Sequence, residues 1–232
     1  MAVSRRAWAA LTGVAVLACA TPAAAATLGG IGPSVLQTSS DTAAIFAVAD
    51  DFAGSGSLSA HIADTGQSWT VTAGGFAVAN GTVAATSSPA PSQAHVTGPG
   101  GSYIASVQFS RPWHRGQGGG LWLNGNAAGT TGVWVIWENR AGGTITMTKY
   151  VNGVPTVLDT RSGVGRPDNS APAPLAVAFD ASLGRYTVMF DAYPPYSVTL
   201  SAADTALLAA NTRVGIRVVS VTEMSSLRVV TQ

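Results

Sequence analysis

The chain is poor in charge, and this scarcity limits the partners it can bind. Charged residues make up 10% of its 232 residues, against a usual share of about 25%. Lys149 is the only lysine, and twelve basic side chains against eleven acidic ones leave a net charge of +1. With neither a basic patch nor an acidic tail, the sequence does not favour nucleic acid or a strongly basic partner.

Cysteine is nearly absent. Cys19 is the only one in the sequence, and it lies in a segment that resembles an export leader. Residues 1–26 combine Arg5 and Arg6, a short apolar run and a final stretch of alanine, which together predict a cleaved signal peptide and a secreted protein. Three alternatives stay open: an uncleaved membrane anchor, a twin-arginine signal, and a lipoprotein attached through Cys19. After cleavage the chain has no disulfide, no thiolate chemistry and no cysteine-bound metal.

Long apolar runs and internal repeats are also lacking after this leader, so no membrane span is expected there. Residues 27–49 are expected to form a lead-in, followed by one domain over residues 50–232. Helical patterning is confined to residues 202–210, which Ser201 or Asp204 could cap.

Short strand-like runs separated by Gly, Pro, Asn and Asp fill the rest of the chain. Asn80-Gly81 and Asn152-Gly153 predict tight hairpin turns, and Pro155 predicts an edge strand or a bulge. About a dozen strands with almost no helix indicate an all-β sandwich or barrel. The predicted strands cover residues 68–72, 75–79, 82–86, 102–110, 120–123, 132–138, 144–150, 156–159, 175–180, 185–191, 197–201, 213–219 and 226–230.

Two groups of residues in this chain resemble the concanavalin A-like lectin and glucanase family, including its laminin-G-like bacterial modules. The first runs from Asp51-Phe52 through Trp69 to Asn80-Gly81, and the second includes Arg185–Val188, Val214–Ile216 and the closing Leu227–Val229. The resemblance covers about residues 50–230. It implies a two-sheet antiparallel jelly roll with a ligand on its concave sheet or rim loops. It does not select a function, because the family includes lectins, hydrolases and adhesion modules.

The strand 132–138 allows a test for an enzyme. Laminarinase-type members of the family carry E-x-D-x-E on one concave strand, and glycoside hydrolysis needs two suitably spaced carboxyl groups. The comparable alternate positions here are Trp134, Ile136 and Glu138, so a single carboxylate remains. The sequence therefore leans against catalysis, with a hydrolase or lyase built around Glu138 as the alternative.

Other catalytic patterns are not supported. His61, His95 and His114 show no metal-ligand spacing, and there is neither a G-x-S-x-G elbow nor a phosphate-binding glycine loop. His114 belongs to a Pro-Trp-His-Arg-Gly cluster that is expected to be a solvated loop. No cofactor is required. Calcium is left open, because lectins of this fold often hold ions in rim loops, and Asp50, Asp51 or Asp64 are the candidates.

The outward faces of three successive strands suggest a binding surface. An aromatic platform suits the C–H patches of a sugar, while Asn and Glu suit its hydroxyl groups. We expect an exported, non-catalytic carbohydrate-binding or adhesion module whose partner is a glycan or cell-surface polysaccharide. The candidate ligand-binding residues are Trp122, Asn124, Trp134, Glu138, Thr146, Thr148 and Tyr150.

The opposing interpretation is that Trp122 and Trp134 are covered by loops and simply pack, which would leave a structural surface protein without a small ligand. Trp69 and Trp137 are assigned to the core. Arg213 and Arg217 are expected to form a solvated face.

Overall fold

The computed structural model describes residues 46–86, 91–109, 117–165, 173–191, 193–219 and 222–232. The predicted signal peptide, with Cys19, and the loop containing His114 lie outside these residues. Residues 46–231 form one compact unit, so its first strand begins at Phe46, inside the segment expected to be a lead-in.

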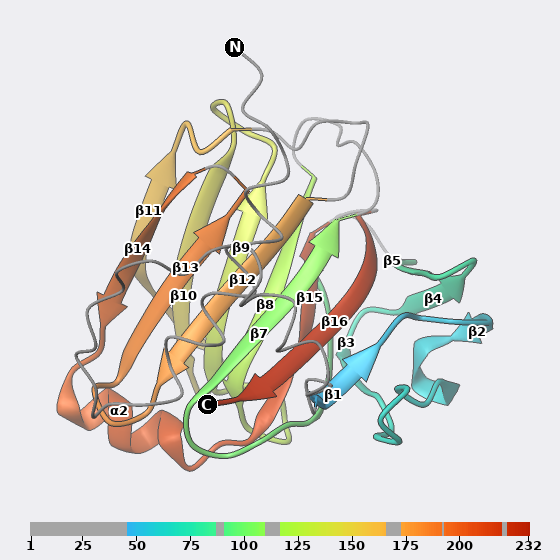
Figure 1. The fold of residues 1–232 in the computed structure, drawn as a ribbon, viewed down its shortest axis with the longest axis horizontal. Helices are drawn as coiled ribbons and strands as arrows, with labels where there is room; N and C mark the ends of the chain where they lie inside the picture. Colours follow the sequence, from blue (N-terminus) through green and yellow to red (C-terminus); the bar gives the residue numbers. More distant parts are fainter. Residues whose placement is uncertain (1–45, 87–90, 110–116, 166–172, 192, 220–221) are drawn as a thin grey trace, which may run out of the picture. The chain divides into compact units, whose positions relative to one another are not determined.

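Alternating apolar residues build two antiparallel sheets that pack face to face, as Figure 1 shows. The nine-stranded sheet has the order β14-β13-β12-β7-β16-β5-β4-β2, with β1 also paired to β16. Its strands are β1 (Phe46–Asp50), β2 (Ser55–Ser57), β4 (Phe76–Ala79), β5 (Thr82–Ala85), β7 (Tyr103–Phe109), β12 (Ala173–Asp180), β13 (Arg185–Phe190), β14 (Tyr193–Thr199) and β16 (Glu223–Thr231).

The seven-stranded sheet has the order β11-β10-β9-β8-β15-β6-β3. Its strands are β3 (Thr70–Ala73), β6 (Ser92–Thr97), β8 (Gly118–Gly125), β9 (Gly132–Glu138), β10 (Thr144–Val151), β11 (Val154–Ser162) and β15 (Arg213–Val219). β15 lies between β6 and β8, and β16 lies between β5 and β7, so a late strand completes the middle of each sheet. The predicted all-β sandwich is confirmed.

Local turn and cap signals act as the sequence predicts. Asn80-Gly81 and Asn152-Gly153 have positive φ angles and join β4 to β5 and β10 to β11. β11, which contains Pro155, is an edge strand. The helix α2 (Ala202–Ala209) starts after Ser201, whose hydroxyl accepts a hydrogen bond from the Asp204 amide. A short 3₁₀ helix, η1 (Leu58–Ala60), follows β2.

The hydrophobic core lies between the sheets and fixes which face of each strand is free. Trp69 and Trp137 are buried in it, as predicted, and Trp137 stacks on Phe190 at 5.8 Å between ring centres. Lys149 Nζ binds Asp204 Oδ1 at 2.6 Å and so connects α2 to the seven-stranded sheet. The inner face of the seven-stranded sheet is therefore buried in the core. Its opposite, outward face is the one that can carry a site.

Candidate functional site

One row of paired residues crosses the outward face of the seven-stranded sheet. His95 on β6 pairs with Gly215 on β15, which pairs with Trp122 on β8; Trp122 pairs with Trp134 on β9, and Trp134 with Thr148 on β10. Because side chains alternate along a strand, all of these residues lie on the same side of the sheet. The two tryptophans are therefore direct cross-strand neighbours.

A second row lies beside the first on the same face. Gln93 pairs with Arg217, Arg217 with Gly120, Gly120 with Ile136, and Ile136 with Thr146. Gly120 contributes no side chain to the middle of this row. Its own Cβ position would lie only 1.8 Å from the backbone oxygen of Val135, so any larger residue would push the neighbouring strand aside.

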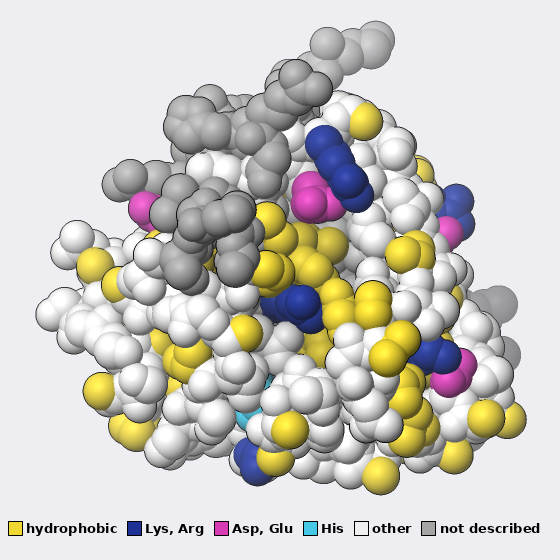
Figure 2. Space-filling view, turned by 180° about the vertical axis from the view of Figure 1, so that it is seen from behind, with side chains coloured by type: hydrophobic (Ala, Val, Ile, Leu, Met, Phe, Trp, Pro, Cys, Tyr) yellow, Lys and Arg dark blue, Asp and Glu magenta, His cyan; other side chains and the backbone are white. Residues whose placement is uncertain are grey.

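Three aromatic rings surround Arg217 where the two rows meet. The guanidinium carbon lies 4.3 Å from the centre of the Trp134 ring, 4.5 Å from that of Tyr150 and 5.8 Å from that of Trp122. The Trp122 and Tyr150 rings are themselves 5.7 Å apart. We call Trp122, Trp134 and Tyr150 the aromatic cage. Figure 2 shows hydrophobic side chains gathered in the middle of this face beside a basic one.

The two indole rings are not open platforms, which corrects the expectation of a wet, tryptophan-lined surface. Trp122 is 0% exposed and Trp134 is 8% exposed. Trp122 fills the space above two glycines: a Cβ on Gly125 would come within 2.1 Å of its Nε1, and one on Gly132 within 2.7 Å of its six-membered ring. Trp122 therefore forms the buried base of the cage, while Tyr150 and Arg217 remain partly exposed.

Asn124 does not lie on this face, and its prediction as a ligand-binding residue was wrong. Its φ angle is +47°, which interrupts the alternation of β8 and turns the side chain inward. There its Oδ1 accepts hydrogen bonds from the hydroxyl groups of Tyr103 at 2.9 Å and Tyr186 at 2.7 Å. Burial raises the pKa of both tyrosines, so both hydroxyls stay protonated and donate to this acceptor.

Arg217 is the residue of the site that sequence reasoning missed. Alternation with Val214, Ile216 and Val218 places it outward, and it was therefore expected to be solvated. In the structure it is half-buried against the cage, and burial lowers the pKa of its guanidinium, an effect that the Tyr150 side chain partly offsets. Nothing local in the sequence indicates these contacts, because they depend on β15 inserting beside β8.

Glu138 lies at the rim of the same face, where Arg140 Nη2 binds its Oε2 at 2.9 Å. Within the described strands of this sheet, it is the only acidic residue on the outward side. Hydrolysis with retention needs a second carboxyl group about 5–5.5 Å away, and hydrolysis with inversion one at about 6.5–9.5 Å. The arrangement of these strands supplies no such partner.

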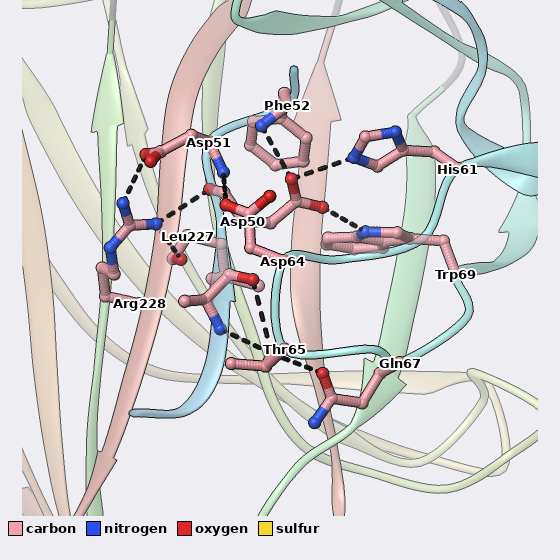
Figure 3. A network of polar contacts seen from close by, with 11 residues as sticks. Asp50, Asp51, Phe52, His61, Asp64, Thr65, Gln67, Trp69, Leu227 and Arg228 are labelled. Carbon is pink, nitrogen blue, oxygen red and sulfur yellow. Dashed lines mark hydrogen bonds and ion pairs between the residues drawn. The ribbon is translucent and has the colours of Figure 1, made fainter. Parts of the chain in front are cut away.

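The three aspartates considered for calcium hold the chain together where β1 ends, as Figure 3 shows. The buried Asp50 carboxylate accepts hydrogen bonds from the Phe52 amide at 2.7 Å, His61 Nε2 at 3.0 Å and Trp69 Nε1 at 2.6 Å. These partners occupy both carboxylate oxygens.

Asp51 and Asp64 belong to the same corner. Asp64 Oδ2 accepts a hydrogen bond from the Asp51 amide at 2.9 Å, and Asp51 forms an ion pair with Arg228. In the described part of the chain, no three His, Cys, Asp or Glu side chains are grouped as metal ligands. The corner is thus built as a structural network.

His95 is a buried polar residue on the outward face of the same sheet. It is 1% exposed, and its Nδ1 has no hydrogen-bond partner within the structure. Burial, reinforced by the nearby Arg213 charge, lowers its pKa from 6.5 to about 4. The imidazole is therefore neutral at physiological pH.

The arrangement of the two sheets is shared with known carbohydrate-active proteins. The carbohydrate-binding module CBM66 from Bacillus subtilis aligns with a TM-score of 0.57 and 14% sequence identity, covering 70% of this chain and 95% of the module. The fold is concanavalin A-like. This agrees with the resemblance of the sequence, although no family model and no curated protein matches it.

Two further concanavalin A-like structures have different activities. An endo-1,3-β-glucanase from Streptomyces sioyaensis gives a TM-score of 0.54 at 12% identity and covers 81% of this chain and 95% of its own. The exoplasmic domain of VIP36 in its Ca²⁺- and mannose-bound form gives 0.51 at 12% identity, with coverages of 73% and 85%. At such identities the comparison establishes the fold, and the function must be argued from the site.

Among the described residues, no helix has the length and hydrophobicity to cross a bilayer.

Proposed function

We propose that the chain is a non-catalytic glycan-binding module whose ligand rests on the outward face of the seven-stranded sheet. The observation that carries this proposal is the aromatic cage around Arg217, half-open in the middle of that face. A sugar ring presents C–H patches that pack on aromatic rings and hydroxyl groups that bind polar side chains. Carbohydrate-binding proteins among the structural neighbours support this proposal.

In the proposed complex, the cage provides the apolar contacts to the sugar and the residues around it provide the polar ones. Tyr150 and the exposed edge of Trp134 provide the apolar contact, and Trp122 holds them in place from below. Glu138, Thr146 and Thr148 lie around the cage on the same sheet and provide polar groups for sugar hydroxyls. Of the residues predicted as ligand-binding, these six are retained in the proposal.

The expected signal peptide, residues 1–26, gives the proposal a location. An exported module of this kind would meet extracellular or cell-surface polysaccharide. Calcium is added as a variable in the experiment, since the VIP36 neighbour is a calcium-bound form.

A glycan array with the purified protein, in calcium and in EDTA, tests the proposal. We expect binding that falls at least about fivefold in Tyr150→Ala, which corresponds to about 1 kcal/mol. Tyr193→Ala is the matched control, because Tyr193 is a partly buried tyrosine on β14 of the other sheet. It should bind like the parent protein.

A reducing-end assay on every bound glycan separates binding from catalysis. New reducing ends that disappear in Glu138→Gln would replace the proposal with a hydrolase or lyase acting through Glu138. No binding to any glycan would favour a structural surface protein.

A further inference from the structure

Among the described residues, two arginines form no ion pair. Ion pairs with described carboxylates are formed by Arg140, Lys149, Arg161, Arg185 and Arg228. Arg213 and Arg217 form none with any described residue, and both lie on the outward side of β15. Because Glu138 on that face is already held by Arg140, the described residues of the outward face carry an excess of positive charge.

The polar atoms left unsatisfied around Arg217 are mainly hydrogen-bond donors. The indole N–H groups of Trp122 and Trp134 and the Nε of Arg217 itself have no partner within the structure. The Thr146 hydroxyl, also without a partner, can donate as well. None of these groups is an obligatory acceptor, so the local field favours an acceptor-rich, negatively charged ligand group.

The burial of Arg217 makes this excess of charge costly. Removing a guanidinium from water without a counter-charge is unfavourable, and contact with aromatic faces offsets only part of that cost. The lowered pKa of Arg217 reflects the same uncompensated burial. A ligand anion would give Arg217 the counter-charge that the five paired basic side chains of the described residues already have.

We infer that the glycan bound at the aromatic cage carries a carboxylate, as in a uronic acid, and that Arg217 binds it. The guanidinium is a planar fork whose N–H groups match the two oxygens of a carboxylate. The inference deepens the proposed function and depends on it.

The test compares acidic oligosaccharides with their own neutral forms. Oligogalacturonate, oligoglucuronate and oligomannuronate are immobilised beside carboxyl-reduced samples of the same oligomers, which keep length and linkage but lose the charge. A neutral glycan array is run in parallel. We expect the parent protein to bind at least one acidic oligomer roughly tenfold more tightly than its reduced form, a difference of about 1.4 kcal/mol.

Two variants of Arg217 assign the preference to this side chain. Arg217→Gln should bind the acidic and reduced oligomers within about twofold of each other, while Arg217→Lys should keep part of the preference because it keeps the charge. Arg185→Gln is the matched control, since Arg185 lies on β13 of the other sheet and is already paired with Asp180. It should preserve the preference.

The outcomes separate this inference from the proposed function. Equal binding of acidic and reduced oligomers, or binding only on the neutral array, would overturn the carboxylate inference and leave glycan binding standing. A preference that persists in a folded Arg217→Gln would overturn the role of Arg217. No binding on either array would overturn the proposed function as well. The comparison of oligomers uses the parent protein alone, so it holds even where a variant is unstable.

Discussion

Arg217 contacts the Trp134 ring at 4.3 Å although their strands, β15 and β9, are not neighbours in the sheet. The arginine reaches across β8, where its paired residue is Gly120. An arginine, a tryptophan and an intervening glycine thus form one unit. A substitution at any of the three should alter the packing of the other two.

Gly120→Ala tests the close approach of the strands under this unit. The added Cβ would lie 1.8 Å from the Val135 backbone oxygen and 2.8 Å from the Ile136 Cα, so β8 and β9 must separate. We expect the free energy of unfolding in urea to fall by at least about 2 kcal/mol. Gly100→Ala, where no atom lies within 4 Å, is the control and should change it by less than about 0.5 kcal/mol. Equal effects of the two variants would contradict this packing.

Trp134→Ala should destabilise the domain as well as weaken binding. Its ring is 8% exposed and packs with Trp122 and Ile136, so its removal leaves a cavity. A loss of about 2–4 kcal/mol in unfolding free energy is expected, with Trp134→Phe losing less. Denaturation followed by circular dichroism measures both. A fully stable Trp134→Ala protein would show instead that the ring is a free platform.

Asn124 anchors two buried tyrosines, and its removal should be costly. Asn124→Ala leaves the Tyr103 and Tyr186 hydroxyls without their shared acceptor, for an expected loss of about 2–4 kcal/mol. Asn124→Gly loses the same acceptor but tolerates the φ angle of +47°, so it should be about 1 kcal/mol more stable than Asn124→Ala. Chemical denaturation of the two variants compares them, and the reverse order would contradict the assigned backbone conformation.

His95 should make the domain sensitive to mild acid. Its pKa is about 4 in the folded protein but near 6.5 when unfolded, so the unfolded state takes up the proton first as the pH falls. The part of the unfolding free energy that depends on a neutral His95 is present in full above pH 6.5 and declines between pH 6.5 and 4. It amounts to about 1–3 kcal/mol. The unfolding free energy of the parent protein minus that of His95→Gln should therefore fall by this amount as the pH is lowered from 6.5 to 4. Parallel curves would contradict a neutral, buried imidazole.

The sequence predicted those parts of the site in which alternation is regular. β9 and β10 alternate without interruption, so the outward positions of Trp134, Thr146, Thr148 and Tyr150 follow from their spacing. Asn124 failed because a single positive φ angle reverses the side of the strand. The signal was present: Asn124-Gly125 is the same dipeptide that predicts the two hairpin turns.

Other features depend on long-range pairing that no local pattern reports. β6 was missed because Gln93 and His95 make its residues look polar, although Ala94 and Val96 reach the core. Likewise, the partners of Arg217 are determined by the insertion of β15 between β6 and β8. Spacing assigns a side chain to a face, whereas topology decides its neighbours.

The central position of β15 and β16 has a consequence for how the protein folds during synthesis. Until these strands are synthesised, β6 and β8 have no partner between them in one layer, and β5 and β7 have none in the other. A growing polypeptide would therefore expose unpaired edges that invite aggregation. Both sheets and the aromatic cage around Arg217 would then be completed together, once the last two strands are in place.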